Sequence, residues 1–314
     1  MSARPVGPED HHQVVIVGGG VAGVSCALEC YDIQLDIVLL ETEAAVGGQT
    51  TEIPFHVRNV AAGVYDDEHP LPWALERSAA ILGDRVRRSW PVDRTDLDAG
   101  WLDSSGRRVT ADAIVIATGV GTRRLPAAED GAFGGDVTYQ LGSDLQRFAG
   151  RQVVMIGGGD NATLDALALA RSGSPVTLVH RADRLNSRPD IAEEVRDNPR
   201  ITELAGWELD QVSGDDRLEE VVLVNSATGE RRSVKAGGLV VKVGKAPRTE
   251  LFQGQVETER SGAVVVDETQ ATSHRGVFAA GDVVAGAYWR IATAMGQGSL
   301  AARSALRYLE GSSR

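Results

Sequence analysis

The chain has 314 residues, of which 42% are hydrophobic and 24% charged, and this length is enough for two compact domains of ordinary size. Its formal net charge of −12 argues against nucleic acid or an anionic membrane surface as a partner, because long-range repulsion would oppose both. No apolar run approaches the roughly 18 residues that span a bilayer, and the polar start lacks a signal-peptide pattern, so we expect a cytoplasmic protein.

The first predicted strand, residues 14–17, runs into a glycine-rich turn and then into an alanine-rich helix. Glycines at GxGxxG spacing permit a tight turn, close approach of backbone N–H groups to a pyrophosphate, and close packing of the helix on the strand. The next strand, residues 37–40, ends at Glu41, whose carboxylate can accept hydrogen bonds from a ribose diol. This order predicts a dinucleotide-binding unit. The glycines of the motif are Gly18, Gly20 and Gly23.

The only two cysteines, Cys26 and Cys30, fall four residues apart in the predicted helix. Their number excludes a disulfide framework and a four-cysteine zinc site, and we expect no metal site. Neither lies in a CxxC motif, so we expect both to pack against the sheet rather than to serve redox chemistry.

A second strand, glycine turn and helix begin at residues 153–156, far enough along the chain for a second domain. Its GxGxxA motif comprises Gly157, Gly159 and Ala162. The following strand, residues 176–179, is succeeded by His180 and Arg181 instead of an acid. A cation at this place suits a 2′-phosphate, which favours NADPH over NADH. Arg184 and Arg188 fit equally a phosphate pocket and a solvated basic helix start.

Two further segments read as apolar strands that end in small residues. Residues 114–117 are followed by Thr118 and Gly119, and the segment GVFAAGD delivers Asp282 just beyond Gly281. The carboxylate of Asp282 can reach a ribityl or pyrophosphate-linked hydroxyl.

Together these residues resemble the thioredoxin-reductase-like branch of flavoproteins with two dinucleotide-binding domains, over nearly the whole chain. The resemblance implies an α/β fold with two Rossmann-like domains, the NADPH domain inserted into a split FAD domain. The expected boundaries are 1–119 and 247–314 for the FAD domain and 120–246 for the NADPH domain. The resemblance also implies FAD and NADPH as cofactors and a homodimer. In addition to the residues above, the resemblance places Gly48, Gln49 and Gln297 at the flavin.

One departure from the family concerns its redox disulfide. Thioredoxin reductases carry a CxxC before the second glycine motif, whereas here Tyr139 and Asp144 bracket residues 140–143, which contain no cysteine. We therefore expect electrons to pass from NADPH through FAD to an external acceptor, a small molecule or a small redox protein such as ferredoxin or flavodoxin. The alternative is an FAD-binding redox sensor or scaffold without NADPH turnover, against which the intact second motif argues.

Candidate catalytic residues are few. His56 follows the loop of residues 47–49 (Gly-Gly-Gln) and could reach the flavin or a substrate, although a hydrogen-bonded loop histidine fits the sequence as well. Tyr288 and Trp289, with Arg290, could wall the flavin pocket, and the alternative for these aromatic residues is ordinary packing.

Overall fold

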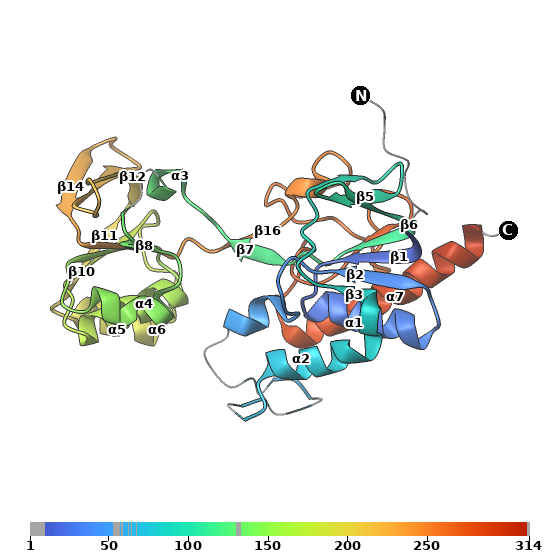
Figure 1. Cartoon of the computed structure of the whole chain (residues 1–314). Helices are drawn as coiled ribbons and strands as arrows, with labels where there is room; N and C mark the ends of the chain where they lie inside the picture. The colour runs from blue at the N-terminus through green and yellow to red at the C-terminus, as the bar shows by residue number, and fades with distance from the viewer. Residues whose placement is uncertain are drawn as a thin grey trace. The chain divides into compact units, whose positions relative to one another are not determined.

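The computed structural model describes residues 10–52, 57, 59–61, 63, 65–66, 68–129 and 133–312, and the chain divides into two compact units. Unit 1 comprises Met1–Gly121 and Ala246–Arg314, and unit 2 comprises Thr122–Lys245 (Figure 1). Each unit contains a sheet whose central strands are parallel, with helices packed against it, so the predicted α/β fold class is confirmed.

Unit 1 is built on a seven-stranded sheet (Figure 1). Its strands are β1 (His11–Val17), β2 (Ile37–Leu40), β3 (Val86–Arg87), β4 (Arg94–Asp96), β5 (Trp101–Ser104), β6 (Arg107–Ile116) and β17 (Val277–Ala279). The order is β3-β2-β1-β6-β5-β4, and β17 pairs in parallel with the last residues of β6, while β5 pairs antiparallel with its first residues. The parallel strands therefore end together at one carboxyl edge.

The apolar runs of these strands are buried on both faces, as is typical of parallel strands. Val14 and Ile16 pack with the long helices on one face, whereas Val15 and Val17 pack into a second cluster on the other face. At Gly298 an added Cβ would lie 2.2 Å from the carbonyl oxygen of Ala22, so glycine permits the helices α1 (Val21–Asp32) and α7 (Ile291–Ser312) to approach closely. The helices of unit 1 are α1 (Val21–Asp32), η1 (Gly48–Glu52), α2 (Leu71–Ala79), η2 (Ala80–Arg85), η3 (Glu250–Phe252) and α7 (Ile291–Ser312).

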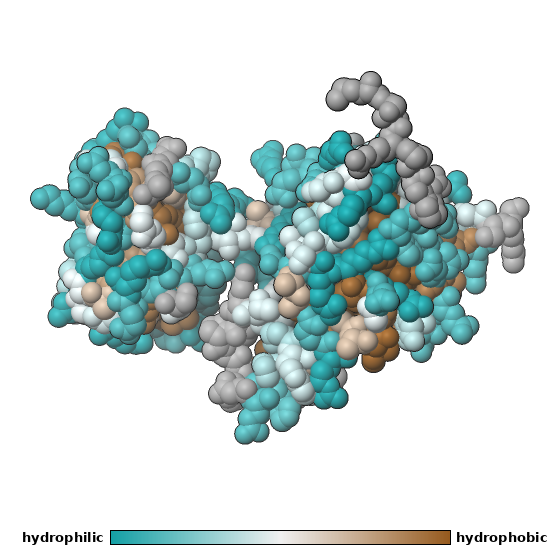
Figure 2. Space-filling view, in the orientation of Figure 1, coloured by the Kyte–Doolittle hydropathy of each residue, from teal (hydrophilic) through white to brown (hydrophobic). Residues whose placement is uncertain are grey.

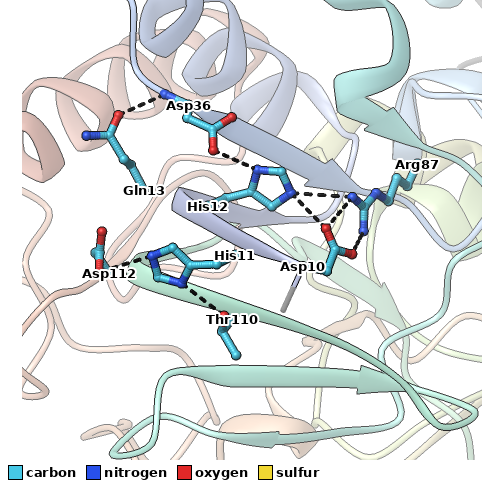
Figure 3. A network of polar contacts seen from close by, with 8 residues as sticks. All are labelled: Asp10, His11, His12, Gln13, Asp36, Arg87, Thr110 and Asp112. Carbon is cyan, nitrogen blue, oxygen red and sulfur yellow. Dashed lines mark hydrogen bonds and ion pairs between the residues drawn. The ribbon is translucent and has the colours of Figure 1, made fainter. Parts of the chain in front are cut away.

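A network of polar contacts surrounds the start of β1 (Figure 3). His12 lies 3.2 Å from Asp10 through Nε2 and 3.1 Å from Asp36 through Nδ1. Asp10 also accepts hydrogen bonds from the Arg87 guanidinium, and these lower the pKa of Asp10 although burial opposes them. The network occupies the end of β1 opposite to Gly18, away from the carboxyl edge of the sheet.

Unit 2 is a three-layer arrangement around a five-stranded parallel sheet. The strands of this sheet are β8 (Val137–Thr138), β9 (Val153–Ile156), β10 (Val176–His180), β11 (Ile201–Ala205) and β15 (Gly238–Val241), in the order β11-β10-β9-β15-β8. One face packs against helices and the other against a three-stranded antiparallel sheet, which the sequence did not predict. The remaining elements of unit 2 are α3 (Pro126–Glu129), α4 (Leu141–Phe148), α5 (Asp160–Arg171), α6 (Pro189–Asp197), β12 (Trp207–Ser213), β13 (Glu220–Asn225) and β14 (Arg231–Lys235).

A fully buried carboxylate, Asp136, ties the two sheets of unit 2 together. It accepts hydrogen bonds from Arg151 at 2.8 Å, from Arg217 at 2.7 Å, and from the backbone N–H of Leu218 at 3.2 Å. Burial alone would raise the pKa of Asp136, but these donors outweigh it and hold the pKa below its usual range.

Two short strands carry the chain between the units and pair with each other, β7 (Val120–Thr122) and β16 (Lys245–Pro247). Beside them in unit 1, the Thr118 hydroxyl donates to the carbonyl of Arg248 at 2.6 Å, and the Arg248 N–H donates to Gly119 at 3.0 Å. The face shown in Figure 2 is mostly hydrophilic in both units, in keeping with the net charge of −12. Across the described ranges, no helix combines the length and the apolar character that a bilayer span requires.

Candidate functional site

The first glycine turn connects β1 to α1, and glycine serves a different physical purpose at each of its three motif positions. Gly18 has φ +106°, and a Cβ there would lie 2.5 Å from the Ala117 carbonyl oxygen. A Cβ at Gly23 would lie 1.8 Å from the Gly18 oxygen, so only glycine allows the helix to pack here. Gly20 is the N-cap of α1, and a Cβ there would meet nothing within 4 Å. The turn thus leaves an open approach at the helix start, where no side chain caps the N–H groups.

Glu41 follows β2 and lies buried against this turn. Its Oε2 accepts the N–H of Gly19 at 2.6 Å, and its Oε1 accepts the N–H of Glu43 at 2.8 Å. Each carboxylate oxygen can accept a further hydrogen bond, so the group that fixes the turn can also take ribose hydroxyls. The structural role of Glu41 in holding the turn was not predicted from the sequence.

Three segments that are far apart in the chain meet beside the turn. Gln49 Nε2 donates to Asp282 Oδ2 at 2.9 Å, and the N–H of Gly281 donates to Gln297 Oε1 at 2.9 Å. Gly281 has φ +85° and a Cβ there would lie 2.8 Å from the Ala22 side chain, so glycine is required for this approach.

Two further predicted residues lie in the same neighbourhood. A Cβ at Gly48 would lie 3.2 Å from Gly20 Cα, and a Cβ at Gly119 would lie 3.8 Å from Gln49 Nε2. The structure therefore brings the predicted flavin-site residues of unit 1 together at the carboxyl edge of one sheet. The open approach at Gly20, the buried Glu41 carboxylate, and the amide and carboxylate groups of Gln49, Gln297 and Asp282 fit the pyrophosphate, ribose and ribityl parts of FAD.

The second glycine turn, between β9 and α5, repeats this construction in unit 2. Gly157 has φ +141°, and a Cβ there would lie 2.3 Å from the carbonyl oxygen of Lys242 and 3.1 Å from the Ala162 side chain. Gly159 is the N-cap of α5, has no side-chain cap, and would leave a Cβ without any atom within 4 Å. This turn therefore offers a second open approach at a helix start.

The structure corrects one detail after this turn. The strand predicted to end at residue 179 extends to His180, because β10 pairs in parallel with β11 through that residue. The imidazole is therefore buried, with Nε2 2.9 Å from Glu203 Oε1, and it does not stand in solvent as the neighbouring Arg181 does. Nδ1 of His180 is buried with no hydrogen-bond partner in the described part of the chain. Glu203 on β11 was not found from the sequence.

Residues 140–143, which we expect at the place of the redox motif of thioredoxin reductases, lie at the start of α4. Gln140 is the N-cap residue and exposed, and Leu141 is buried in the core. Tyr139 donates to Glu129 Oε1 at 2.6 Å, and burial, together with this carboxylate, raises the pKa of the Tyr139 phenol. A cleft of about 610 Å³ adjoins this segment. Its lining residues are Thr122, Arg124, Ala128, Glu129, Phe133, Gly134, Gly135, Val137, Thr138, Tyr139, Gln140 and Asp144.

The two cysteines are fully buried on α1, as predicted. A hydrogen bond with Cys30, together with burial, raises the pKa of the Cys26 thiol. Among the candidate catalytic residues, Tyr288 and Trp289 are 83% and 46% exposed, and their proposed role at the flavin stays a prediction. His56 lies outside the described residues.

Comparisons with known proteins extend over both units. The family model described as "Pyridine nucleotide-disulphide oxidoreductase" matches residues 12–298. A thioredoxin reductase of Streptomyces clavuligerus is 33% identical over 307 residues, which cover 96% of this chain and 94% of that protein. A Clostridium pasteurianum protein described as "34.2 kDa protein in rubredoxin operon" is 29% identical over 306 residues, covering 96% of this chain and 99% of that protein.

Solved structures give the same result. The thioredoxin reductase of Lactococcus lactis in its FR conformation matches with a TM-score of 0.76 and 28% identity, covering 96% of this chain and 99% of that one. The resemblance predicted from the glycine motifs and strand ends is confirmed. The chain belongs to the pyridine nucleotide-disulphide oxidoreductase family, and it is an FAD-dependent NAD(P)H oxidoreductase of the thioredoxin-reductase-like type that uses FAD and NADPH.

Proposed function

We propose that this enzyme passes electrons from NADPH through FAD to an external acceptor, with no disulfide of its own in the path. The observation that carries the proposal is the start of α4, where Gln140 and Leu141 stand in a segment that contains no cysteine. Disulfide exchange needs an attacking thiolate. The only two thiols in the chain, Cys26 and Cys30, are fully buried in the core of unit 1.

Unit 1 is the FAD site of this proposal. The uncapped N–H groups at the start of α1 face the open side of Gly20 and would hold the pyrophosphate. The Glu41 carboxylate would take the adenosine ribose, and the Gln49–Asp282 pair would take the flavin half. FAD, when bound, supplies the chemistry that accepts a hydride from the coenzyme and passes electrons to the acceptor.

Unit 2 is the NADPH site. The start of α5 at Gly159 would hold the coenzyme pyrophosphate, as the start of α1 does in unit 1. Arg181 follows β10 and is exposed, so its guanidinium can form a charge-assisted contact with the 2′-phosphate. The selectivity for NADPH over NADH is assigned to this residue.

Three observations bear on the acceptor. The relative named for a rubredoxin operon supports a small redox protein. The net charge of −12 weakens the association with an acidic redox protein, which favours a small molecule instead. The cleft of about 610 Å³ beside Tyr139 and Gln140 has the volume of a small-molecule site, and we assign it to such an acceptor.

The test is NADPH oxidation with two groups of acceptors. Quinones, ferricyanide, ferredoxin and flavodoxin form the first group, and thioredoxin and dithionitrobenzoate form the second. We expect turnover with a member of the first group and no disulfide reduction beyond the rate of free reduced flavin. The control is the double variant Cys26→Ala, Cys30→Ala, which should match the wild type in every assay. Robust thioredoxin reduction that disappears in the double variant would refute the proposal.

A further inference from the structure

The sheet of unit 2 has a topological switch point between β9 and β15. From β9 the chain continues to β10 and β11 on one side, whereas β15 lies on the other side. In open parallel sheets, ligands lie outside the carboxyl ends of the strands at such a point. Gly157 and Lys242 are the first residues beyond β9 and β15, and the N–H of Lys242 donates to the Ile156 carbonyl at 2.7 Å. Lys242 therefore borders the crevice of the switch point.

The two sides of this crevice serve different halves of a dinucleotide. β10 ends at His180 and is followed by Arg181, so under the proposed function the adenosine half lies on that side of β9. A coenzyme with its pyrophosphate at the start of α5 then extends its nicotinamide half toward the end of β15. Lys242 stands on the nicotinamide side.

Lys242 forms an ion pair on this side. Its Nζ lies 3.0 Å from Oδ2 of Asp165, which is on α5, and the two side chains are 20% and 28% exposed. An ammonium has three N–H donors and a carboxylate two acceptor oxygens, so both groups can form further hydrogen bonds after their mutual contact. A partly buried ion pair adds little to stability, because desolvation offsets most of the attraction. The pair therefore offers one donor and one acceptor side by side to a polar ligand.

We propose that Lys242 and Asp165 recognise the carboxamide of the nicotinamide ring through hydrogen bonds. A carboxamide carries a carbonyl oxygen, which accepts, and an NH₂ group, which donates, and the pair presents the two complementary functions. The Lys242 ammonium donates to the carbonyl oxygen, and the Asp165 carboxylate accepts from the NH₂ group. This fixes the rotation of the ring, and therefore which of its faces meets the acceptor of the hydride. The proposal rests on the assignment of NADPH to unit 2.

The test compares equilibrium binding of NADP⁺ and its 3-acetylpyridine analogue, which keeps the carbonyl but has a methyl group in place of NH₂. Binding to the FAD-loaded protein is measured by calorimetry. The wild type should bind NADP⁺ at least about tenfold more tightly, because the analogue leaves the Asp165 carboxylate without its donor. Asp165→Ala should abolish this discrimination. Lys242→Met should weaken both ligands by a similar factor of about tenfold, since both keep the carbonyl.

Two controls separate recognition from a structural role. 2′,5′-ADP lacks the nicotinamide half, so its affinity should be unchanged in both variants and reduced only by Arg181→Ala. Glu193→Ala, an exposed carboxylate on α6, should leave all affinities unchanged. Wild-type protein that binds NADP⁺ and the analogue equally, or variants that lose stability while the discrimination persists, would overturn the carboxamide proposal alone. Wild-type protein that binds neither 2′,5′-ADP nor NADP⁺ would overturn the NADPH assignment as well.

Discussion

A substitution of Gly20, at the start of α1, should weaken cofactor binding without affecting the stability of the fold. Gly20 has φ −72° and a Cβ there meets nothing within 4 Å, so Gly20→Ser adds a side chain without strain. Serine is a favourable N-cap, and the free energy of unfolding of the apoprotein should change by less than about 0.5 kcal/mol. The added group nevertheless stands over the first-turn N–H groups. If the FAD phosphates lose two charge-assisted bonds of at least about 1.5 kcal/mol each, the dissociation constant rises about a hundredfold.

The assay is a titration of the apoprotein with FAD, followed by flavin fluorescence, with Gly159→Ser as the matched control. Gly159 has the same position at the start of α5 and equally open surroundings. Gly159→Ser should therefore keep the FAD affinity of the wild type and weaken NADP⁺ binding. Gly23→Ala, whose Cβ would lie 1.8 Å from the Gly18 oxygen, should instead destabilise the fold. Wild-type FAD affinity in Gly20→Ser, or loss of FAD in Gly159→Ser, would refute the assignment of the two turns.

Three other predictions concern charge and burial. Arg181→Ala should raise the Michaelis constant for NADPH by about tenfold or more and leave that for NADH unchanged in steady-state assays, and equal effects on both coenzymes would contradict its role. Asp136→Leu should lower the free energy of unfolding in urea by about 3 kcal/mol, because the partly buried Arg151 loses its partner. The pKa of Asp136 is lowered in the folded state, so the carboxylate's contribution to the free energy of unfolding is fully present above its unfolded pKa of about 3.9. This contribution is lost as the pH falls through the folded pKa. A difference in the free energy of unfolding between wild type and Asp136→Leu that persists in stronger acid would therefore contradict the role of the charged carboxylate. Cys26 and Cys30 should react with a thiol reagent only after denaturation, and fast reaction of the folded protein would show that they are not buried.

Local patterns in the sequence were sufficient to predict the central strands and the helices that follow them. A continuous apolar run followed by glycines predicted the strands that the structure shows as β1 and β9, and the runs before Glu41 and His180 predicted β2 and β10. These predictions succeed because a strand buried on both faces is apolar at every position and the turn after it requires glycine.

Contacts between distant residues were not predictable in this way. Glu203 meets His180 only because β11 pairs with β10, and Asp165 meets Lys242 only because α5 packs on the sheet that contains β15. The three-stranded sheet was also not predicted, since β12 is mostly half-buried and its alternation of apolar and polar residues is interrupted by a bulge between Leu209 and Gln211. Such partners are set by tertiary packing, and a single sequence carries no local signal for them.

The central claim is that one chain binds both FAD and NADPH and transfers electrons between them and an acceptor that is not its own disulfide. The most direct measurement is an anaerobic titration of the FAD-loaded protein with NADPH, followed at the visible absorbance band of the flavin. The account predicts rapid and stoichiometric bleaching, and recovery of the band when a quinone or a redox-protein acceptor is added. A band that NADPH leaves unchanged would contradict the account and favour a flavin-binding protein without turnover.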